Sequence, residues 1–276
     1  MNALVSILVE NTTPSPSLIG EYGFSALLEV DERKILFDTG SNDALFKNAE
    51  NLGINLEEVE ALVISHGHFD HTGAVIPFLQ RFGPKKLYLH PDIFSQRFLQ
   101  MKKGLGPNIG CPFAAEDLVK NGAEIIFIDS FSEIMPGVFI SGEIPRKNSF
   151  ENTGGNFKVA TAHGLLEDKL LDDMALLVDH PEGLIIISGC AHSGMINTIE
   201  YIQERTGRSK MLAFIGGTHL ITASEDRLAQ TIAVLKMMDI EKIAVGHCTG
   251  FYAAARLLNE LGPRVIKADT GMSFSF

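Results

Sequence analysis

The sequence has little of what marks secreted, membrane-spanning or disulfide-stapled proteins. It holds three cysteines, Cys111, Cys190 and Cys248, which are odd in number and form no CxxC pair, so no disulfide framework is expected. The opening residues MNALVSILVEN carry no basic leader and no small-residue cleavage site, and are predicted to form a strand. No apolar run approaches the roughly 18 to 20 residues of a membrane span. We therefore expect a cytoplasmic protein with no membrane partner.

Positive charge is also scarce. The sequence has 23 Lys and Arg against 34 Asp and Glu, which gives a formal net charge of −11. Sequence-independent binding to nucleic acid requires a basic face, so a nucleic-acid partner is not expected. A small anionic substrate remains compatible with this balance, because it needs only a few local basic side chains.

Short apolar runs separated by polar or glycine-containing turns are abundant, and this pattern is typical of strands. The runs are ALVSILVE (3–10), SALLEV (25–30), KILFDTG (34–40), ALVISHG (61–67), KLYLHP (86–91), EIIFID (124–129), VFISGEI (138–144), MALLVDHPEGLIIISG (174–189), MLAFIGGTH (211–219) and KIAVGHC (242–248). The run at 174–189 is expected to form a hairpin that turns at Pro181 to Gly183.

Helical periodicity occupies seven other segments. They are 44–52, 72–82, 92–101, 114–121, 195–206, 225–238 and 251–261. Together the runs predict an α/β or α+β fold, with sheets inside and helices outside, and the length allows one large domain or two small ones. The segment MKKGLGPNIGCPF at 101–113 is rich in Gly and Pro and is predicted to be a loop, so a lid is expected around 91–113. A homodimer through an exposed edge strand is compatible with this pattern.

Three of the nine histidines and an aspartate are concentrated in SHGHFDH, where the apolar run 61–67 ends. His66 and His68 are two residues apart, so they share one side of an extended backbone and can bind one ion. Asp70 and His71 lie at the turn into the next helix and can point to a neighbouring position. Imidazole and carboxylate together suit zinc, iron or manganese. The alternative, a purely structural cluster, leaves several polar groups at a sheet end uncompensated.

Three later segments repeat one design, an apolar strand followed by a small-residue turn that contains histidine. They are LIIISGCAHSG with His192, LAFIGGTHL with His219 and IAVGHCTG with His247. Strands that end at the same sheet edge bring their terminal residues together. We therefore expect these histidines to join His66 and His68.

These features resemble the metallo-β-lactamase superfamily from Leu4 to about Val265, with HxHxDH after a hydrophobic strand, ILFDTG upstream and histidines at later strand ends. The segments HPDIFSQR, GEIPR, SGCAHSGMIN, IGGTHL and GHCTG are similar to a narrower branch of metal-dependent hydrolases and dihydropterin–ribofuranosylaminobenzene phosphate synthases. The resemblance implies a single domain over 1–276, built as an αββα sandwich of two mixed sheets between helix layers. It also implies a one- or two-metal site at the sheet edge and mostly hydrolytic chemistry. For this chain we predict two divalent ions, zinc first, with manganese or iron as alternatives.

The resemblance also implies which residues hold the metals. The expected ligands are His66, His68 and His192 for the first ion, and Asp70, His71 and His247 for the second. Where the superfamily usually has a bridging aspartate, this sequence has Cys190, which is either a thiolate ligand or a small buried residue beside the site. His163 occupies another position at which a first-site histidine can occur. Asp38 either orients a ligand histidine or stabilises its own turn.

Basic residues in irregular segments are the candidate substrate contacts. Arg97 and Lys103 lie beside or in the expected lid, and Arg146 lies in GEIPRKNSF. Near two metal ions on an acidic protein, such groups would favour a small molecule that carries phosphate. Each of them can otherwise be an ordinary solvated charge.

Two divalent ions about 3.5 to 4 Å apart can share a water molecule, lower its pKa toward about 7 and stabilise charge on a phosphoryl oxygen. Asp70, as a partner of that water, and His219, as an acid or base facing the substrate, are the candidate catalytic residues. We therefore predict a metal-dependent hydrolase, or an enzyme that releases phosphate or pyrophosphate from a small phosphorylated, pterin-related metabolite.

Three alternatives stay open at this point. The first is a pterin-type synthase that condenses its substrates with loss of pyrophosphate. The second is an iron-dependent redox enzyme, although the chain is too short for the flavin domain that such relatives normally add. The third is a non-catalytic sensor that binds its ligand at the metal site.

Overall fold

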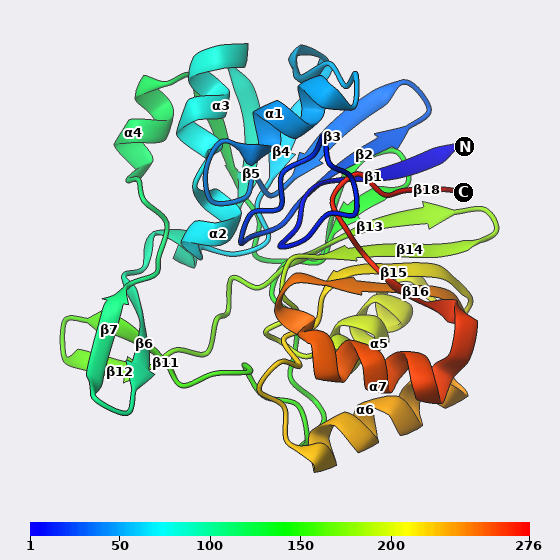
Figure 1. Ribbon diagram of the computed structural model, residues 1–276. Helices are drawn as coiled ribbons and strands as arrows, with labels where there is room; N and C mark the ends of the chain where they lie inside the picture. The colour runs from blue at the N-terminus through cyan, green and yellow to red at the C-terminus, as the bar shows by residue number, and fades with distance from the viewer.

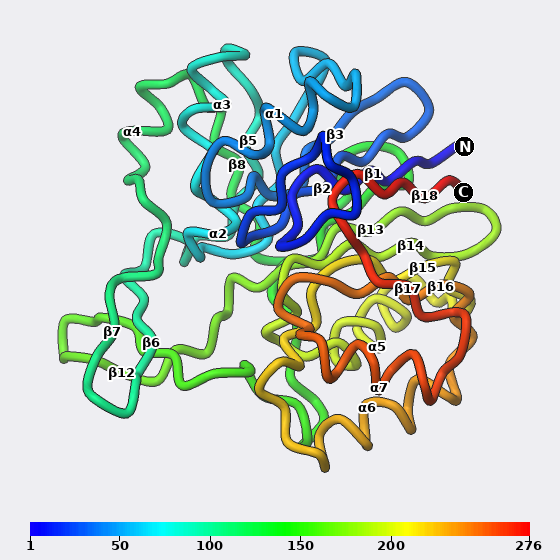
Figure 2. Tube along the Cα trace, in the orientation of Figure 1, coloured from blue at the N-terminus to red at the C-terminus, as the bar shows by residue number.

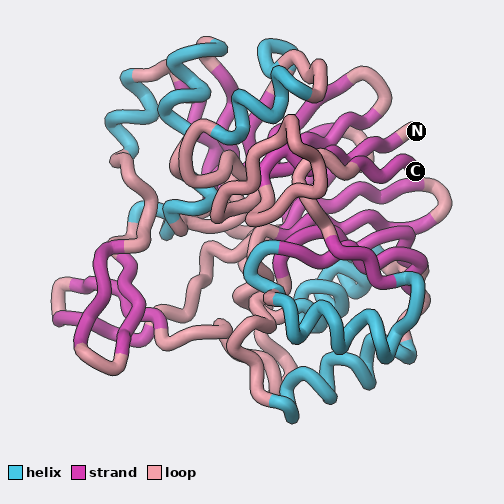
Figure 3. Tube along the Cα trace, in the orientation of Figure 1, coloured by secondary structure: helices cyan, strands magenta, loops and turns pink.

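Two seven-stranded sheets lie face to face between two layers of helices in the computed structural model of the protein, which describes residues 1–276 (Figure 1). Helices cover the outer face of each sheet, and strands fill the middle of the molecule (Figure 3). The two termini lie side by side, because the last strand pairs with the first. This arrangement confirms the predicted αββα fold class.

The N-terminal sheet has the strand order β18-β1-β2-β3-β4-β5-β8. Its strands are β1 (Ala3–Val9), β2 (Ser25–Val30), β3 (Arg33–Phe37), β4 (Ala61–Val63), β5 (Lys85–Leu89), β8 (Ala123–Phe127) and β18 (Ser273–Ser275). The strands β3, β4, β5 and β8 are parallel, so helices must cross between them. These helices are α1 (Ala44–Asn51), α3 (Val75–Phe82) and α4 (Ala115–Lys120).

The C-terminal sheet has the strand order β17-β16-β15-β14-β13-β10-β9. Its strands are β9 (Ser132–Met135), β10 (Val138–Ile140), β13 (Ala175–His180), β14 (Gly183–Ser188), β15 (Met211–Gly217), β16 (Ile240–Gly246) and β17 (Val265–Lys267). The strands from β14 to β17 are parallel and are connected by α5 (Met195–Thr206), α6 (Glu225–Met237) and α7 (Phe251–Leu261). The predicted hairpin is confirmed as β13 and β14.

Central strands of both sheets are buried on both faces, which explains their continuous apolar sequences. In β3, Ile35 and Phe37 belong to the core between the two sheets, whereas Leu36 packs under the helices of the N-terminal layer. In β14, Ile185 faces the inter-sheet core and Ile186 packs under α5 to α7. Successive residues of each central strand thus point alternately into the core between the sheets and into the core under the helices on that side.

A four-stranded antiparallel sheet, which we call the arm, projects from the sandwich (Figure 2). Its strands, in the order β12-β11-β6-β7, are β6 (Arg97–Met101), β7 (Gly104–Asn108), β11 (Phe157–Thr161) and β12 (Gly164–Glu167). The predicted helix at 92–101 is wrong, because only a short 3-10 helix, Pro91–Phe94, precedes β6. The predicted loop at 101–113 is wrong in part, because β7 pairs with β6. Pairing with the distant strand β11, which no local pattern indicates, holds this segment extended.

The remaining predicted helices agree with the structure to within one or two residues, with one exception. The predicted helix at 72–82 is two helices, α2 (Phe69–Thr72) and α3, which are separated at Gly73. No helix combines the length and the apolar character that crossing a bilayer requires.

Candidate metal centre

The carboxyl ends of five strands meet at one edge of the sandwich, and a polar side chain follows each of them. Asp38 follows β3, His66 follows β4, His192 follows β14, His219 follows β15 and His247 follows β16. Parallel strands deliver their last residues to the same edge, which is why residues so distant in sequence converge here. The structure brings the six expected ligands into two adjacent groups, each of which could hold a metal ion.

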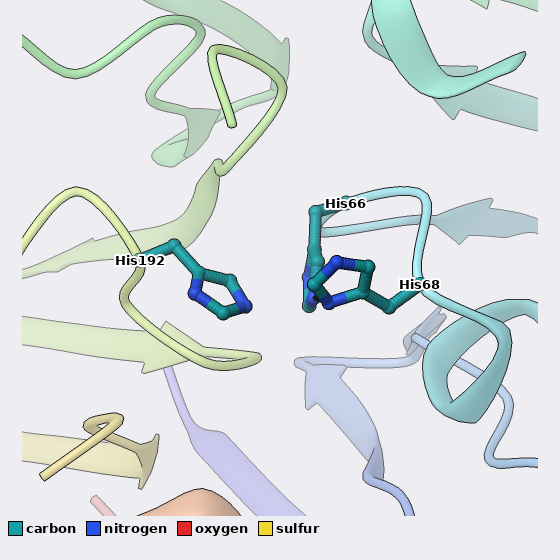
Figure 4. A group of neighbouring side chains, drawn as sticks. All are labelled: His66, His68 and His192. Atoms are coloured by element: carbon teal, nitrogen blue, oxygen red, sulfur yellow. Dashed lines mark hydrogen bonds between the residues drawn. The ribbon is translucent and has the colours of Figure 1, made fainter. Parts of the chain in front are cut away.

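The first group contains His66, His68 and His192, whose rings point toward one another (Figure 4). The centroid of the His66 ring lies 4.6 Å from that of His68 and 4.8 Å from that of His192. All three side chains are buried. Burial lowers the pKa of His66 and His192, and it lowers the pKa of His68 to about 3, so the three imidazoles are neutral, as metal ligands must be.

Hydrogen bonds to the other ring nitrogens leave ligand atoms free in this group. His192 Nδ1 donates to the carbonyl oxygen of Thr153 at 2.7 Å, while its Nε2 is buried without a partner. His66 Nδ1 lies 2.9 Å from Ser65 Oγ, and its Nε2 faces His68 Nδ1 at 3.0 Å, which places two nitrogens toward one position. A buried ring nitrogen without a hydrogen bond, such as His192 Nε2, is costly, and a metal ion in the group would satisfy it. The residues present therefore fit a metal.

The second group contains Asp70, His71 and His247. Asp70 Oδ2 lies 3.3 Å from His247 Nε2 and 3.8 Å from His71 Nε2. The opposite nitrogens of both rings are anchored, His71 Nδ1 to Asp38 Oδ2 at 2.7 Å and His247 Nδ1 to Asn11 Oδ1 at 2.9 Å. Both Nε2 atoms are therefore turned toward the carboxylate of Asp70, in the arrangement that a bound cation requires.

The carboxylates of Asp38 and Asp70 place negative charge on both sides of His71 in the second group. Burial acts to lower the pKa of His71, but the charges of Asp38 and Asp70 outweigh it and raise the pKa to about 9. Burial acts to raise the pKa of Asp70, but the neighbouring His71 and His247 outweigh it and hold that pKa well below its usual range. The two carboxylates favour positive charge here, and a bound cation would take the place of the proton on His71, because only a neutral imidazole can ligate a metal.

Cys190 lies between the two groups. It forms one possible ligand cluster with His66 and His71 and a second with His247 and Cys248. Its Sγ is 3.3 Å from His71 Nε2. Burial raises the pKa of the Cys190 thiol, and coordination to a metal would lower it. The structure thus places Cys190 beside the expected ligands, within reach of both groups.

A cavity of about 220 Å³ opens over the two groups. Its lining includes the expected ligands His68, Asp70 and His247 together with the predicted catalytic residue His219. The ring of His219 lies 4.4 Å from that of His192, and its Nδ1 is buried against Gly154. The ring nitrogen that a molecule in the cavity could reach is therefore Nε2.

The three expected substrate contacts do not line this cavity. Arg97 is 1% exposed, and its guanidinium donates to the carboxylates of Asp168 and Asp172. Lys103 is exposed in the turn between β6 and β7, and Arg146 donates to the carbonyl oxygen of Leu170 at 3.1 Å. The arrangement around the cavity gives no support to a substrate-binding role for them.

His163, the alternative ligand, is also away from both groups. It is exposed in the turn between β11 and β12 and belongs to none of the possible ligand clusters. Asp38 accepts hydrogen bonds from the backbone and side chain of Ser65 at 2.7 Å, as well as the one from His71. The structure therefore places Asp38 where it orients a ligand histidine.

Sequence reasoning missed several groups that complete this edge. Glu10 Oε1 accepts the backbone N–H of His247 at 2.6 Å, and Asn11 orients the ring of the same residue. Both directly follow the buried strand β1, which is the signal that could have found them. Cys248 carries a similar signal, since it follows His247 at a strand end. The carbonyl group of Thr153 leaves no trace in the sequence, because any residue can provide it.

Comparisons with known proteins agree with this geometry. Residues 18–138 match the family model described as the metallo-beta-lactamase superfamily. A protein of Methanocaldococcus jannaschii, named 7,8-dihydropterin-6-methyl-4-(beta-D-ribofuranosyl)-aminobenzene-5'-phosphate synthase, is 33% identical over 266 residues, which span 93% of this chain and 90% of the relative.

Two solved structures share the fold. Tm1679, named a metal-dependent hydrolase of the β-lactamase superfamily, is similar with a TM-score of 0.85 and 24% identity, covering 99% of this chain and 98% of its own. Zn(2+)-bound PqqB from Methylobacterium extorquens has a TM-score of 0.58 and 15% identity, covering 98% of this chain and 99% of its own. With its αββα sandwich, its histidine-rich sheet edge and a relative of this similarity along almost its whole length, the chain belongs to the metallo-β-lactamase superfamily.

Proposed function

We propose that the protein is a dinuclear metal-dependent enzyme that hydrolyses a small phosphorylated metabolite or releases phosphate or pyrophosphate from it. The observation that carries this proposal is that two adjacent groups of ligand atoms open on one cavity. His68 from the first group, and Asp70 and His247 from the second, line that cavity. A single molecule bound there would contact both groups.

The donor atoms favour zinc, with manganese or iron as alternatives, because imidazole nitrogens dominate and a carboxylate and a thiol complete the set. Divalent ions in the two groups would supply Lewis acidity toward a phosphoryl oxygen and would acidify a water molecule.

Two side chains of the cavity wall have the positions expected for orienting a water molecule and for proton transfer. Asp70 stands where the second group meets the cavity, so its carboxylate can accept a hydrogen bond from an attacking water molecule and orient it. His219 presents Nε2 to the cavity, and burial lowers its pKa, so the ring is neutral near pH 7. We assign to His219 the acceptance of a proton from the attacking water molecule, because a neutral imidazole can take up a proton but has none to give to a leaving group.

One further candidate reaction is the condensation of a dihydropterin pyrophosphate with a ribofuranosylaminobenzene phosphate. It is favoured by the relative that is 33% identical and is named as a synthase of such a product. The rest of the cavity lining also fits a flat ring, because Tyr22, Phe69 and Phe157 form aromatic walls beside Leu99 and Ile109.

Metal analysis followed by a substrate screen tests the proposal. We expect two zinc, manganese or iron ions per chain in untagged protein, and turnover of a phosphomonoester, phosphodiester or pyrophosphate in a panel of small metabolites. Formation of the condensed pterin product, detected by mass spectrometry, would select the synthase reaction. Tight binding of a metabolite without turnover of any compound would contradict an enzyme and favour a sensor.

The variant His219→Gln tests the assignment of the proton-transfer residue. We expect kcat to fall by about 10²-fold or more while the metal content stays at the wild-type value, because His219 belongs to neither ligand group. His163→Gln, which alters an exposed histidine of the arm, is the matched control and should leave kcat unchanged. Equal activity of the two variants would remove His219 from the mechanism.

A further inference from the structure

Arg97 is among the largest fully buried side chains of the protein, although arginine is rarely buried completely. It lies at the base of the arm, as the first residue of β6. Its Nε donates to Asp168 Oδ2 at 2.9 Å, and its Nη2 donates to Asp172 Oδ1 at 2.8 Å. One guanidinium thus joins the start of β6 to two carboxylates of the segment that follows β12.

Asp172 extends this connection to the metal centre. Its second oxygen, Oδ2, accepts the backbone N–H of Gly67 at 2.8 Å. Gly67 is the residue between the expected ligands His66 and His68. A chain of two hydrogen bonds therefore leads from Arg97 through a single carboxylate to the backbone of the His66–His68 turn.

Direct packing reinforces the same connection. A Cβ atom added to Gly67 would lie 2.4 Å from Arg97 Nη1 and 2.4 Å from the carbonyl oxygen of Ile93. The guanidinium therefore lies against the Cα of this glycine, and no residue with a side chain fits there without displacing it. The His66–His68 turn and the Arg97 side chain therefore pack in direct contact.

The arm holds the other end of the same turn through its backbone. Arg97 accepts the N–H of Ile109 at its carbonyl oxygen at 2.7 Å, and Ile109 in turn accepts the N–H of Phe69 at 2.9 Å. The ring of Phe157, from β11, lies 5.2 Å from that of His68. Both ends of the segment that carries His68 are thus attached to the arm.

Buried ion pairs contribute little net stability, because desolvation offsets their attraction, so stability alone gives a weak reason for three buried charges here. We propose that Arg97 and Asp172 are positioning residues that hold the His66–His68 turn in its metal-binding geometry and couple it to the arm. Leu99 of the arm and Ile109, which directly follows β7, line the cavity. A molecule that contacts the arm is thereby linked to the metal ligands through Arg97. This inference goes beyond the proposed function and holds for any substrate.

Two aspartate variants test the proposal as a matched pair. Asp172→Asn and Asp168→Asn each remove one charge partner of Arg97, but only Asp172 also holds Gly67. We expect Asp172→Asn to weaken Co(II) binding about 10- to 100-fold in a chelator competition and to change the visible spectrum of bound Co(II). We expect Asp168→Asn to stay within about twofold of wild type, with an unchanged spectrum.

Arg97→Lys gives a second readout if Asp172→Asn fails to fold. An ammonium group cannot reproduce the fork that reaches both carboxylates, so Co(II) affinity should fall, and the spectrum should shift in the same direction. Wild-type affinity and spectrum in Arg97→Lys and Asp172→Asn would overturn the proposal. The proposal would also be overturned if Asp168→Asn and Asp172→Asn lost equal Co(II) affinity and if these losses paralleled the decrease in the Tm of each variant.

Failure of this proposal and failure of the proposed function are separate results. If wild type binds Co(II) but turns over no phosphorylated compound, the proposed function fails, and the comparison of the aspartate variants still decides the role of Arg97. If wild type turns over a substrate while the Asp172→Asn protein keeps its metal affinity and spectrum, only the positioning role fails. If wild type binds no divalent ion, both are overturned.

Discussion

Four residues at the sheet edge that carries the expected ligands have left-handed backbone conformations, which residues other than glycine rarely adopt. The φ angles are 57° for Asp38, 51° for Ala191, 45° for His219 and 51° for His247. Each left-handed residue costs about 1 to 3 kcal/mol and persists only where surrounding contacts determine it. For Asp38 these contacts are the hydrogen bonds with Ser65 and His71 described above. Four such residues at one edge indicate that the backbone here is held by the positions its side chains must occupy, at a cost in local stability.

Removal of one histidine from each ligand group should separate the two metal positions. We expect His68→Ala and His247→Ala each to lower the metal content by about one ion per chain, because each removes a ligand from a different group. Metal analysis of purified protein after dialysis measures this loss. Retention of both ions in both variants would contradict the ligand assignment.

Asp173 should make stability fall as pH rises. Its Oδ2 accepts the N–H of Ser193 at 2.8 Å, but its Oδ1 is buried without a partner, and burial raises its pKa from 3.8 to about 6. Below pH 3.8 both the folded and the unfolded chain hold this proton. Between pH 3.8 and 6 the unfolded chain loses it first, so folding loses on the order of 3 kcal/mol.

The variant Asp173→Asn keeps the acceptor for Ser193 and cannot ionise. We therefore expect its free energy of unfolding, measured in urea, to exceed that of wild type by an amount that grows from pH 4 to pH 7. A difference that stays constant with pH, or that shrinks as pH rises, would show that Asp173 does not ionise in this range.

At the scale of elements, the helical periodicity of 72–82 does not form one helix, because the backbone leaves helical dihedral angles at Ala74, with φ −96° and ψ 8°. Its neighbour Gly73 keeps helical angles and lies against the turn after β3. A Cβ at this position would lie 1.9 Å from the carbonyl oxygen of Ser41, a backbone atom that cannot move aside alone. The absence of a side chain at Gly73 therefore lets the chain that carries Asp70 and His71 pack directly on the turn after β3. Periodicity detects the apolar face of a helix, but it cannot detect a close approach by a distant backbone.

Gly73→Ala should lower the free energy of unfolding by about 2 kcal/mol or more, because the added methyl group overlaps that carbonyl oxygen. Gly207→Ala is the control: Gly207 has a φ of 69° at the end of α5, and its added Cβ meets no atom within 4 Å. The control should lose only about 1 kcal/mol, the usual cost of a left-handed alanine. Equal losses in urea unfolding would mean that the contact with Ser41 relaxes without cost.

Elements with local signals could be predicted from the sequence, and elements that depend on distant partners could not. The helix 195–206 and the hairpin at 174–189 follow from periodicity and from a turn. The expected ligands follow from a motif and from repeated strand ends. The arm did not follow, because β6 and β11 become strands only by pairing with each other across about 60 residues of chain. The role of Arg97 was missed for the same reason, since its partners lie in a segment with no recognisable motif.

At the scale of the whole molecule, each ligand group joins the two halves of the sandwich. The first group combines His66 and His68, after β4 of the N-terminal sheet, with His192, after β14 of the C-terminal sheet. The second combines Asp70 and His71 with His247, which follows β16. A metal ion in either group would therefore add a link between the two sheets, beside the apolar core and the hydrogen bonds of Glu10 and Asn11 with His247.

Such a connection predicts that metal ions stabilise the fold. At a free metal concentration about 100 times Kd, binding to the folded state alone adds about 2.7 kcal/mol. For a protein of this size that corresponds to an increase in Tm of about 5 °C for each ion bound, measured by calorimetry with and without zinc. A variant with both His192→Ala and His247→Ala should lose this increase, because it lacks the ligand that the C-terminal sheet contributes to each group. An equal increase in wild type and in this variant would place the stabilising metal outside the two groups, and no increase in wild type would exclude a metal link between the sheets.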